Sequence, residues 1–190
     1  MSIVALIITG VAVAGFYAWY AAIVARRNRV SEALSGIDVQ LQQRHDLIPN
    51  LLAIARRFME HERSLMAAIT ELRAKAFQQV GERDFSKVSE KFEMEAKLGQ
   101  RMSELLVLAE NYPALRSDGP MLEAQRTYTE VEGNIAAARR FYNSSVADLA
   151  NAVQIFPGPL LMGLAGVASL PPAFKAVDAA RAPIDASAHL

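Results

Sequence analysis

The sequence predicts an all-α protein in which an N-terminal transmembrane helix is followed by an antiparallel bundle of long helices. Two observations support this fold class. Residues 2–25 form a run of 24 residues without a formal charge, and a helix that crosses a bilayer needs about 20 apolar residues. Beyond this run, apolar residues recur at alternating steps of three and four, the spacing of one helix face. No strand-like alternation interrupts that pattern.

Composition restricts the classes of function. The 190 residues suffice for one domain with appendages. Lys and Arg together number 20, as do Asp and Glu, so no overall field attracts nucleic acid, and we expect no nucleic-acid partner. The chain has no Cys, which excludes disulfides, thiol nucleophiles and Cys-based metal sites.

The charges beside the apolar run predict its orientation in a membrane. Arg26, Arg27 and Arg29 follow the run directly, and basic residues mark the cytoplasmic end of a span. A cleavable signal peptide carries its basic residues before a shorter core, the opposite arrangement. We therefore expect a single-pass membrane protein, with a short N-terminus outside, these arginines at the membrane interface and the rest in the cytoplasm.

Small residues recur every four positions along the span, at Gly10, Ala14, Ala18 and Ala22. This spacing places them on one helix face, where a second helix can approach closely. Small residues are also simply common in membrane helices. With that alternative open, the pattern predicts a transmembrane association face and a homo-oligomer.

The soluble part divides into long helices. An apolar stripe runs from residue 30 to residue 76, with gaps at Arg44 and Glu62, and a break follows near 81–84. A second helix is expected over 85–112 and a third over 121–155, separated by a turn that contains Pro113 and Pro120.

These patterns give three parts: a transmembrane anchor at 1–25, a helical bundle at 26–156, and an apolar Pro/Gly-rich segment with a flexible tail at 157–190. Prolines and glycines interrupt the third part, so it is not expected to form a second span. The charged runs "EHER" and "EKFEMEAK" are expected to face solvent.

The stretch "QQRHDLIPNLL" places His45 and Asp46 shortly before Pro49, and it predicts a structural hinge or cap. In one interpretation Asp46 caps a new helix that returns toward the membrane, with Pro49 in its first turn. In the other, one helix continues and Pro49 kinks it. We favour the continuous helix, because the apolar stripe keeps its phase across Pro49 and because a hairpin there would drive a longer returning helix into the bilayer. The bundle then has three or four helices, depending on whether the helix kinks or breaks at Pro49.

No pattern of catalytic or metal-ligating residues emerges. The positions three and four residues from His45 and from His61 hold no strong metal ligand, and the third histidine, His189, lies in the tail. Adjacent helix residues point about 100° apart, so His45 and Asp46 do not form a base and its orienting partner. We expect no catalytic residues, no metal site and no cofactor.

Several motifs carry a family resemblance. The run "NRVSEALSGIDVQLQQRHDLIPNLL", followed in order by "NYPALR", "EGNIAAARRFYN" and "FPGPLLMGL", resembles the LemA family over roughly residues 20–164. The chain departs from the family pattern at "LANAVQ" and at "GLAGV". The resemblance implies a protein of the bacterial cytoplasmic (inner) membrane with one N-terminal span, a cytoplasmic helical bundle and no established enzymatic activity.

The predicted function is a non-enzymatic, membrane-anchored helical scaffold that self-associates and shapes or organises the membrane. Its expected partners are the lipid bilayer, further copies of itself and other membrane proteins. The alternative is a regulatory adaptor of another membrane protein, such as an envelope-stress protease, which would offer a groove instead of a contact between copies.

Overall fold

The computed structural model describes residues 2–81 and 85–174, and the elements in these ranges are all helical. This confirms the all-α prediction. The elements, in chain order, are α1 (Ser2–Ala55), the 3-10 helix η1 (Glu60–Glu62), α2 (Arg63–Phe77), α3 (Phe85–Ala109), α4 (Pro113–Arg116), α5 (Gly119–Gln154) and α6 (Gly158–Leu161).

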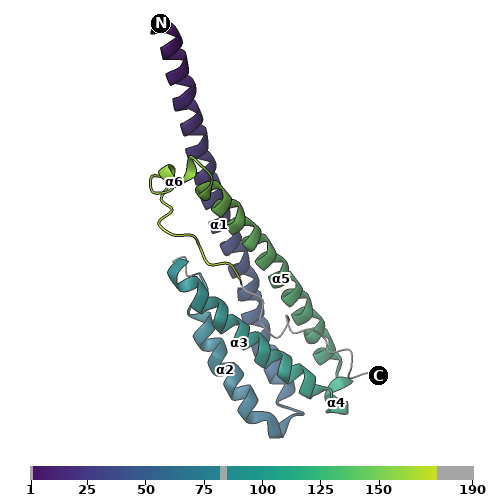
Figure 1. Ribbon diagram of the computed structural model, residues 1–190. Helices are drawn as coiled ribbons and strands as arrows, with labels where there is room; N and C mark the ends of the chain where they lie inside the picture. Colours follow the sequence, from purple (N-terminus) through teal and green to yellow (C-terminus); the bar gives the residue numbers. More distant parts are fainter. Residues whose placement is uncertain (1, 82–84, 175–190) are drawn as a thin grey trace, which may run out of the picture.

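The first helix is unbroken. α1 contains 54 residues and continues through Pro49, so Asp46 does not begin a helix and the chain does not turn back at residues 44–46. Its N-terminal part holds a window that is long and apolar enough to cross a membrane, none of it buried within the protein. One helix therefore supplies both an exposed apolar segment and a wall of the bundle (Figure 1).

The expectation that this helix also includes residues 56–76 is wrong. α1 ends at Ala55, and tight turns follow in which Arg57 N–H donates to the Ile54 carbonyl and Phe58 N–H to the Ala55 carbonyl. Met59 adopts φ −111° and ψ 64° and is fully buried. No Gly or Pro marks this turn. The apolar stripe continues across it because α1 and α2 face the same core, so periodicity alone does not reveal the reversal.

The remaining boundaries lie close to those expected. α3 ends at Ala109, three residues before the predicted end, because Tyr112 and Pro113 begin the short α4. α5 begins where the side chain of Asp118 accepts a hydrogen bond from the backbone N–H of Met121 at 3.0 Å, with a proline in its first turn. This is the N-cap arrangement that favours a helix start.

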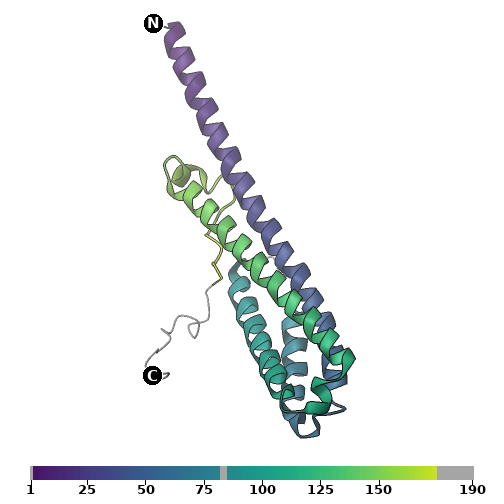
Figure 2. The same ribbon diagram turned by 90° about the vertical axis from the view of Figure 1, so that its right-hand side faces the viewer.

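The molecule has three levels along α1 (Figures 1 and 2). At the end far from the N-terminus, α1, α2, α3 and α5 enclose a distal core that includes Ile48, Leu51, Ile69, Leu98, Met102 and Leu105. In the middle, α1 and α5 pack along a proximal core that includes Ile23, Val30, Ile37, Leu41, Ile135 and Leu149. Beyond α6, α1 extends alone.

The segment after α6 returns along the bundle (Figure 2). The hydroxyl of Tyr142 donates to the Pro172 carbonyl at 3.0 Å, and Asn143 exchanges two hydrogen bonds with the backbone of Phe174. The Phe174 ring stacks on Phe92 with centroids 3.9 Å apart. The segment thus closes the proximal core. The predicted flexible tail, with His189, lies outside the described residues.

Candidate functional site

A layer of buried and partly buried ionisable side chains lies where the two cores meet. We call it the ionic layer, and it consists of Asp38, Arg44 and His45 from α1, Lys91 and Glu95 from α3, and Glu132 from α5. Arg44, His45, Lys91 and Glu95 are at most 1% exposed. Buried charges are costly unless they are paired, so the partners of these groups decide whether the layer is stable.

Glu95 is the centre of the layer. Its carboxylate accepts a hydrogen bond from Arg44 on one oxygen and lies 2.8 Å from His45 Nε2 with the other. Arg44 also donates to the Glu95 backbone carbonyl and to Glu132 Oε1, each at 3.0 Å. Lys91 donates to Asp38. Each carboxylate therefore faces a cation on another helix, so the layer joins α1, α3 and α5.

The pKa shifts show which interactions prevail. Burial alone would raise the pKa of Glu95, but the hydrogen bond from His45 and the positive charge of Arg44 outweigh it and hold this pKa below its ordinary value of 4.5. Burial likewise opposes the charge of Arg44, and Glu95 and Glu132 raise its pKa nevertheless. At Asp38 burial prevails over Lys91 and raises the pKa. The Arg44–Glu95 pair is therefore held in its ionised form.

Pro49 explains a further contact of His45. A proline has no N–H, so it cannot donate to the carbonyl four residues earlier, which here belongs to His45. Arg73 of α2 donates to this carbonyl through Nε at 2.7 Å. The neighbouring Phe77 ring meets the His45 ring edge-on, with centroids 5.6 Å apart. The proline thus leaves the His45 carbonyl without a donor from α1, and Arg73 of α2 donates to it instead.

The ionic layer is poorly suited to chemistry on an external substrate. The His45 ring and the Glu95 carboxylate are almost completely enclosed by the bundle, so a substrate could not reach them without separation of the helices. Across residues 2–81 and 85–174, no group of three His, Cys, Asp or Glu side chains is arranged to hold a metal ion. His61 is exposed at the turn between α1 and α2.

The structure separates the residues of the predicted hinge or cap. His45 is buried in the ionic layer, whereas Asp46 and Pro49 are exposed on the outer face of α1. Asp46 accepts a hydrogen bond from Gln42 at 3.0 Å, one turn earlier on the same helix. His45 thus makes the interhelical contact, while Pro49 acts through the backbone.

The predicted residues of the span lie at the other end of α1. Gly10, Ala14 and Ala18 are exposed and Ala22 is partly buried. Arg26, Arg27 and Arg29 are exposed one to two turns further along the helix; we treat these three as a single basic cluster below.

The expectation that "EKFEMEAK" faces solvent is wrong for two of its residues, because Lys91 and Glu95 are buried. The same expectation for "EHER" is confirmed: Glu60 and Arg63 form an ion pair in which both side chains are 77% exposed. A signal for the buried residues was present in the sequence. Lys91 and Glu95 fall on the same helix face as Val88, Phe92 and Leu98, at spacings of three and four residues. In the same way, Arg44 fills a gap in the apolar stripe of α1. Opposite charges at core positions of different helices indicate a buried pair.

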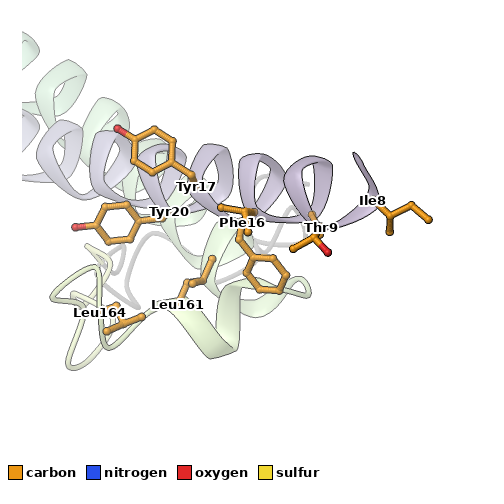
Figure 3. Close-up of a pocket in the computed structure, with 9 residues that line it drawn as sticks. Ile8, Thr9, Phe16, Tyr17, Tyr20, Leu161 and Leu164 are labelled. Carbon is orange, nitrogen blue, oxygen red and sulfur yellow. The ribbon is translucent and has the colours of Figure 1, made fainter. Parts of the chain in front are cut away.

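A groove lies between the exposed part of α1 and α6 (Figure 3). Its volume is about 770 Å³, and its walls are seven residues of α1 between Ile8 and Tyr20 together with Leu161 and Leu164. Most of these side chains are apolar, so the groove offers few groups that would orient a polar ligand.

Together, these features define a class: an all-α bundle, braced by a buried ionic layer, whose first helix continues into an apolar segment long enough to cross a membrane. The model of the LemA family matches residues 33–186, which is most of the chain, and the chain belongs to this family. No curated protein matches the sequence. Three of the motifs behind the family resemblance lie in features described above: the motif at 28–52 and the motif at 132–143 meet in the ionic layer, and the motif at 156–164 contains α6.

Proposed function

We propose that this chain is a non-enzymatic, membrane-anchored scaffold that self-associates at the bacterial cytoplasmic membrane and holds its bundle in the cytoplasm. The observation that carries the proposal is the single helix α1. Its first part is apolar and uncovered, and its second part is a wall of the bundle. Without an intervening linker, a partner bound through the span would fix the positions of the bundles as well.

The orientation of the span supports self-association. At about 100° per residue, the face with Gly10, Ala14 and Ala18 points roughly 145° away from the centre of the α6 groove. α5 and α6 pack on the groove side of α1, so they leave the small-residue face uncovered. At Gly10 an added β-carbon would meet nothing within 4 Å. A second copy can approach this face without displacing any part of the bundle.

The basic cluster at residues 26–29 supports the cytoplasmic placement of the bundle, because it follows the apolar segment and is exposed at its bundle end. The enclosed ionic layer supports a non-enzymatic role, since its His45 and Glu95 hold helices together and are at most 1% exposed. Organisation of the membrane would follow from an array of such spans.

A matched pair of substitutions tests self-association. Ala14→Leu adds a bulky side chain on the small-residue face, and Ala12→Leu makes the same change on the groove side of the same helix. In lipid nanodiscs and detergent, the unaltered chain is expected to form oligomers by crosslinking and light scattering. Ala14→Leu should shift the population toward monomers and Ala12→Leu should not.

A strictly monomeric full-length chain across a wide concentration range would overturn the scaffold. Crosslinking in cells distinguishes the adaptor alternative. Crosslinks mainly between copies of this chain support the scaffold. Crosslinks to one dominant foreign membrane protein, without crosslinks between copies, would overturn the scaffold and support the adaptor.

A further inference from the structure

Residues 155–164, which we call the α5–α6 corner, expose large apolar side chains. Ile155, Phe156, Leu160 and Leu164 are 57%, 73%, 63% and 75% exposed. They belong to a stretch, residues 149–174, that contains no charged residue. An exposed apolar group of this size usually marks a surface that another molecule or a membrane covers.

The corner lies level with the apolar segment of α1. The indole N–H of Trp19 donates to the Ala152 carbonyl at 3.1 Å, near the end of α5. α6 then borders the groove with residues 8–20 of α1 (Figure 3). A span needs about 20 residues, and every window of that length within residues 2–25 includes residues 8–20. A bilayer that surrounds the span therefore meets α6 at the same depth.

The backbone of the corner suits an apolar medium, where unsatisfied N–H groups are costly. Pro157 and Pro159 have no N–H. Gly158 donates to the Ile155 carbonyl at 2.7 Å, and Leu160 donates to the Pro157 carbonyl at 3.1 Å. Four further donors after Leu161 bond within the same segment, namely those of Met162, Ala165, Gly166 and Val167. The chain can leave water here with these donors satisfied.

Gly158 fixes the corner against α5. A β-carbon at this position would lie 2.1 Å from the Ala152 carbonyl oxygen and 2.9 Å from the Val153 Cα, so a side chain would collide with backbone. The absence of one lets α6 fold back tightly, which holds the exposed apolar side chains beside α1.

The basic cluster lies at a suitable distance. Arg26 is seven residues beyond Trp19, or about 10 Å along the helix, and interfacial apolar elements enter the boundary between headgroups and acyl chains by about 5–10 Å. The guanidinium of Arg27 lies against Gly166 in the segment that follows α6. Lipid phosphates at this level would therefore meet cations, while the acyl chains meet the corner.

We infer that the α5–α6 corner inserts into the leaflet on the bundle side of the membrane, where phospholipid acyl chains cover its apolar side chains and fill the groove beside α1. The inference rests on the proposed membrane anchoring. The bundle is then held at two points, by the span and by the corner. Lipid is the occupant that the geometry favours, because the groove opens along the same surface of α1 that acyl chains already surround.

The absence of cysteine provides a direct test. Single cysteines that replace Leu160, Leu164, Val11 or Val107 in the full-length chain can each carry a nitroxide label. In vesicles of phosphatidylethanolamine and phosphatidylglycerol, collisions with oxygen report the apolar phase and collisions with a soluble nickel chelate report water. Val11 is an exposed residue of the span, and Val107 is an exposed residue near the far end of α3.

The expected result is that labels at Val11, Leu160 and Leu164 collide mainly with oxygen, whereas the label at Val107 collides mainly with the chelate. If Val11 collides with oxygen while Leu160 and Leu164 behave like Val107, corner insertion is overturned and the anchor stands. If Val11 also collides with the chelate, the anchor itself fails. Labels at Leu160 and Leu164 that are shielded from both reagents and show spin–spin broadening would place a second copy on the corner and overturn lipid insertion.

Discussion

The two halves of α1 are the same helix in two different environments. In the N-terminal half, Ile3, Leu6 and Ile7 are 74%, 72% and 61% exposed, whereas in the other half Val30, Ile37 and Leu41 are at most 1% exposed. The first half is apolar on every side and the second has one apolar stripe between polar faces. A helix that is apolar all round suits lipid, and a helix with a stripe suits a bundle. The environment changes along the helix although the backbone does not.

The comparison also shows where charge is tolerated. The uncovered half has no charged residue up to Ala25, while the bundle half places Arg44 inside the core. That is tolerable because α3 and α5 supply carboxylates that meet it. The most polar residues of the core are thus also those that define how three helices align.

Removal of the central carboxylate should have the largest effect. Glu95→Ala removes the buried carboxylate from Arg44 and leaves its guanidinium with the partly exposed Glu132 and the backbone carbonyl of residue 95. Breaking a buried pair costs about 3–5 kcal/mol. We expect a loss of this size in the free energy of unfolding, measured by urea titration of the micelle-bound full chain with circular dichroism.

The exposed Glu93 on the same helix provides the control. Glu93→Ala should leave the free energy of unfolding nearly unchanged. The double variant Arg44→Met/Glu95→Met should lose less than Glu95→Ala, because it removes the unpaired charge. Equal effects of Glu95→Ala and Glu93→Ala would contradict the ionic layer as a structural element.

The two halves of α1 can be compared with one substitution. Ile37→Ala removes a fully buried side chain from the proximal core and should cost about 2–5 kcal/mol of unfolding free energy. Ile7→Ala makes the same change in the uncovered half and should leave the bundle as stable as before. The urea midpoint of each variant in micelles measures the difference. If Ile7→Ala destabilises the bundle as much as Ile37→Ala does, the N-terminal half packs against the bundle in solution.

A smaller effect is expected at the carbonyl that Pro49 leaves free. Arg73→Ala removes the donor to the His45 carbonyl, and loss of a hydrogen bond to a charged group costs about 1.5–3 kcal/mol. In a Pro49→Ala background the helix regains its own N–H donor for that carbonyl, so Arg73→Ala should cost less there. Urea unfolding of the four chains gives the coupling, and a coupling of zero would mean that Pro49 and Arg73 act independently.

The sequence was sufficient for the long helices, because their stripes and caps are local. The apolar run at 2–25, the break before α3 and the prolines at 113 and 120 are all visible in a short window of residues. The turn at 56–62 was missed because burial of Met59 against distant residues, and not a Gly or Pro, forms it. The α1 stripe also keeps its phase in α2, so its period does not show that the chain reverses.

The candidate site was only half predictable. His45 stood out as one of three histidines, and a structural role as part of a hinge or cap was expected for it. Its partner Glu95 lies 50 residues away in a run that resembles a solvated face. Pairing between helices depends on how they align, which no single window of sequence contains. The role of Pro49 required the same information, since Arg73 reaches the free carbonyl from a different helix.

In the proposed membrane-anchored arrangement, the continuity of α1 makes its bundle half a lever arm. From Arg26 to Ala55 the helix extends about 44 Å at 1.5 Å per residue. Transmembrane helices tilt by about 20° on average, and the tilt follows bilayer thickness. Such a tilt would displace the far end of α1 sideways by roughly 15 Å. Because α1 is continuous from the apolar segment to Ala55, a change in bilayer thickness would then swing the whole bundle.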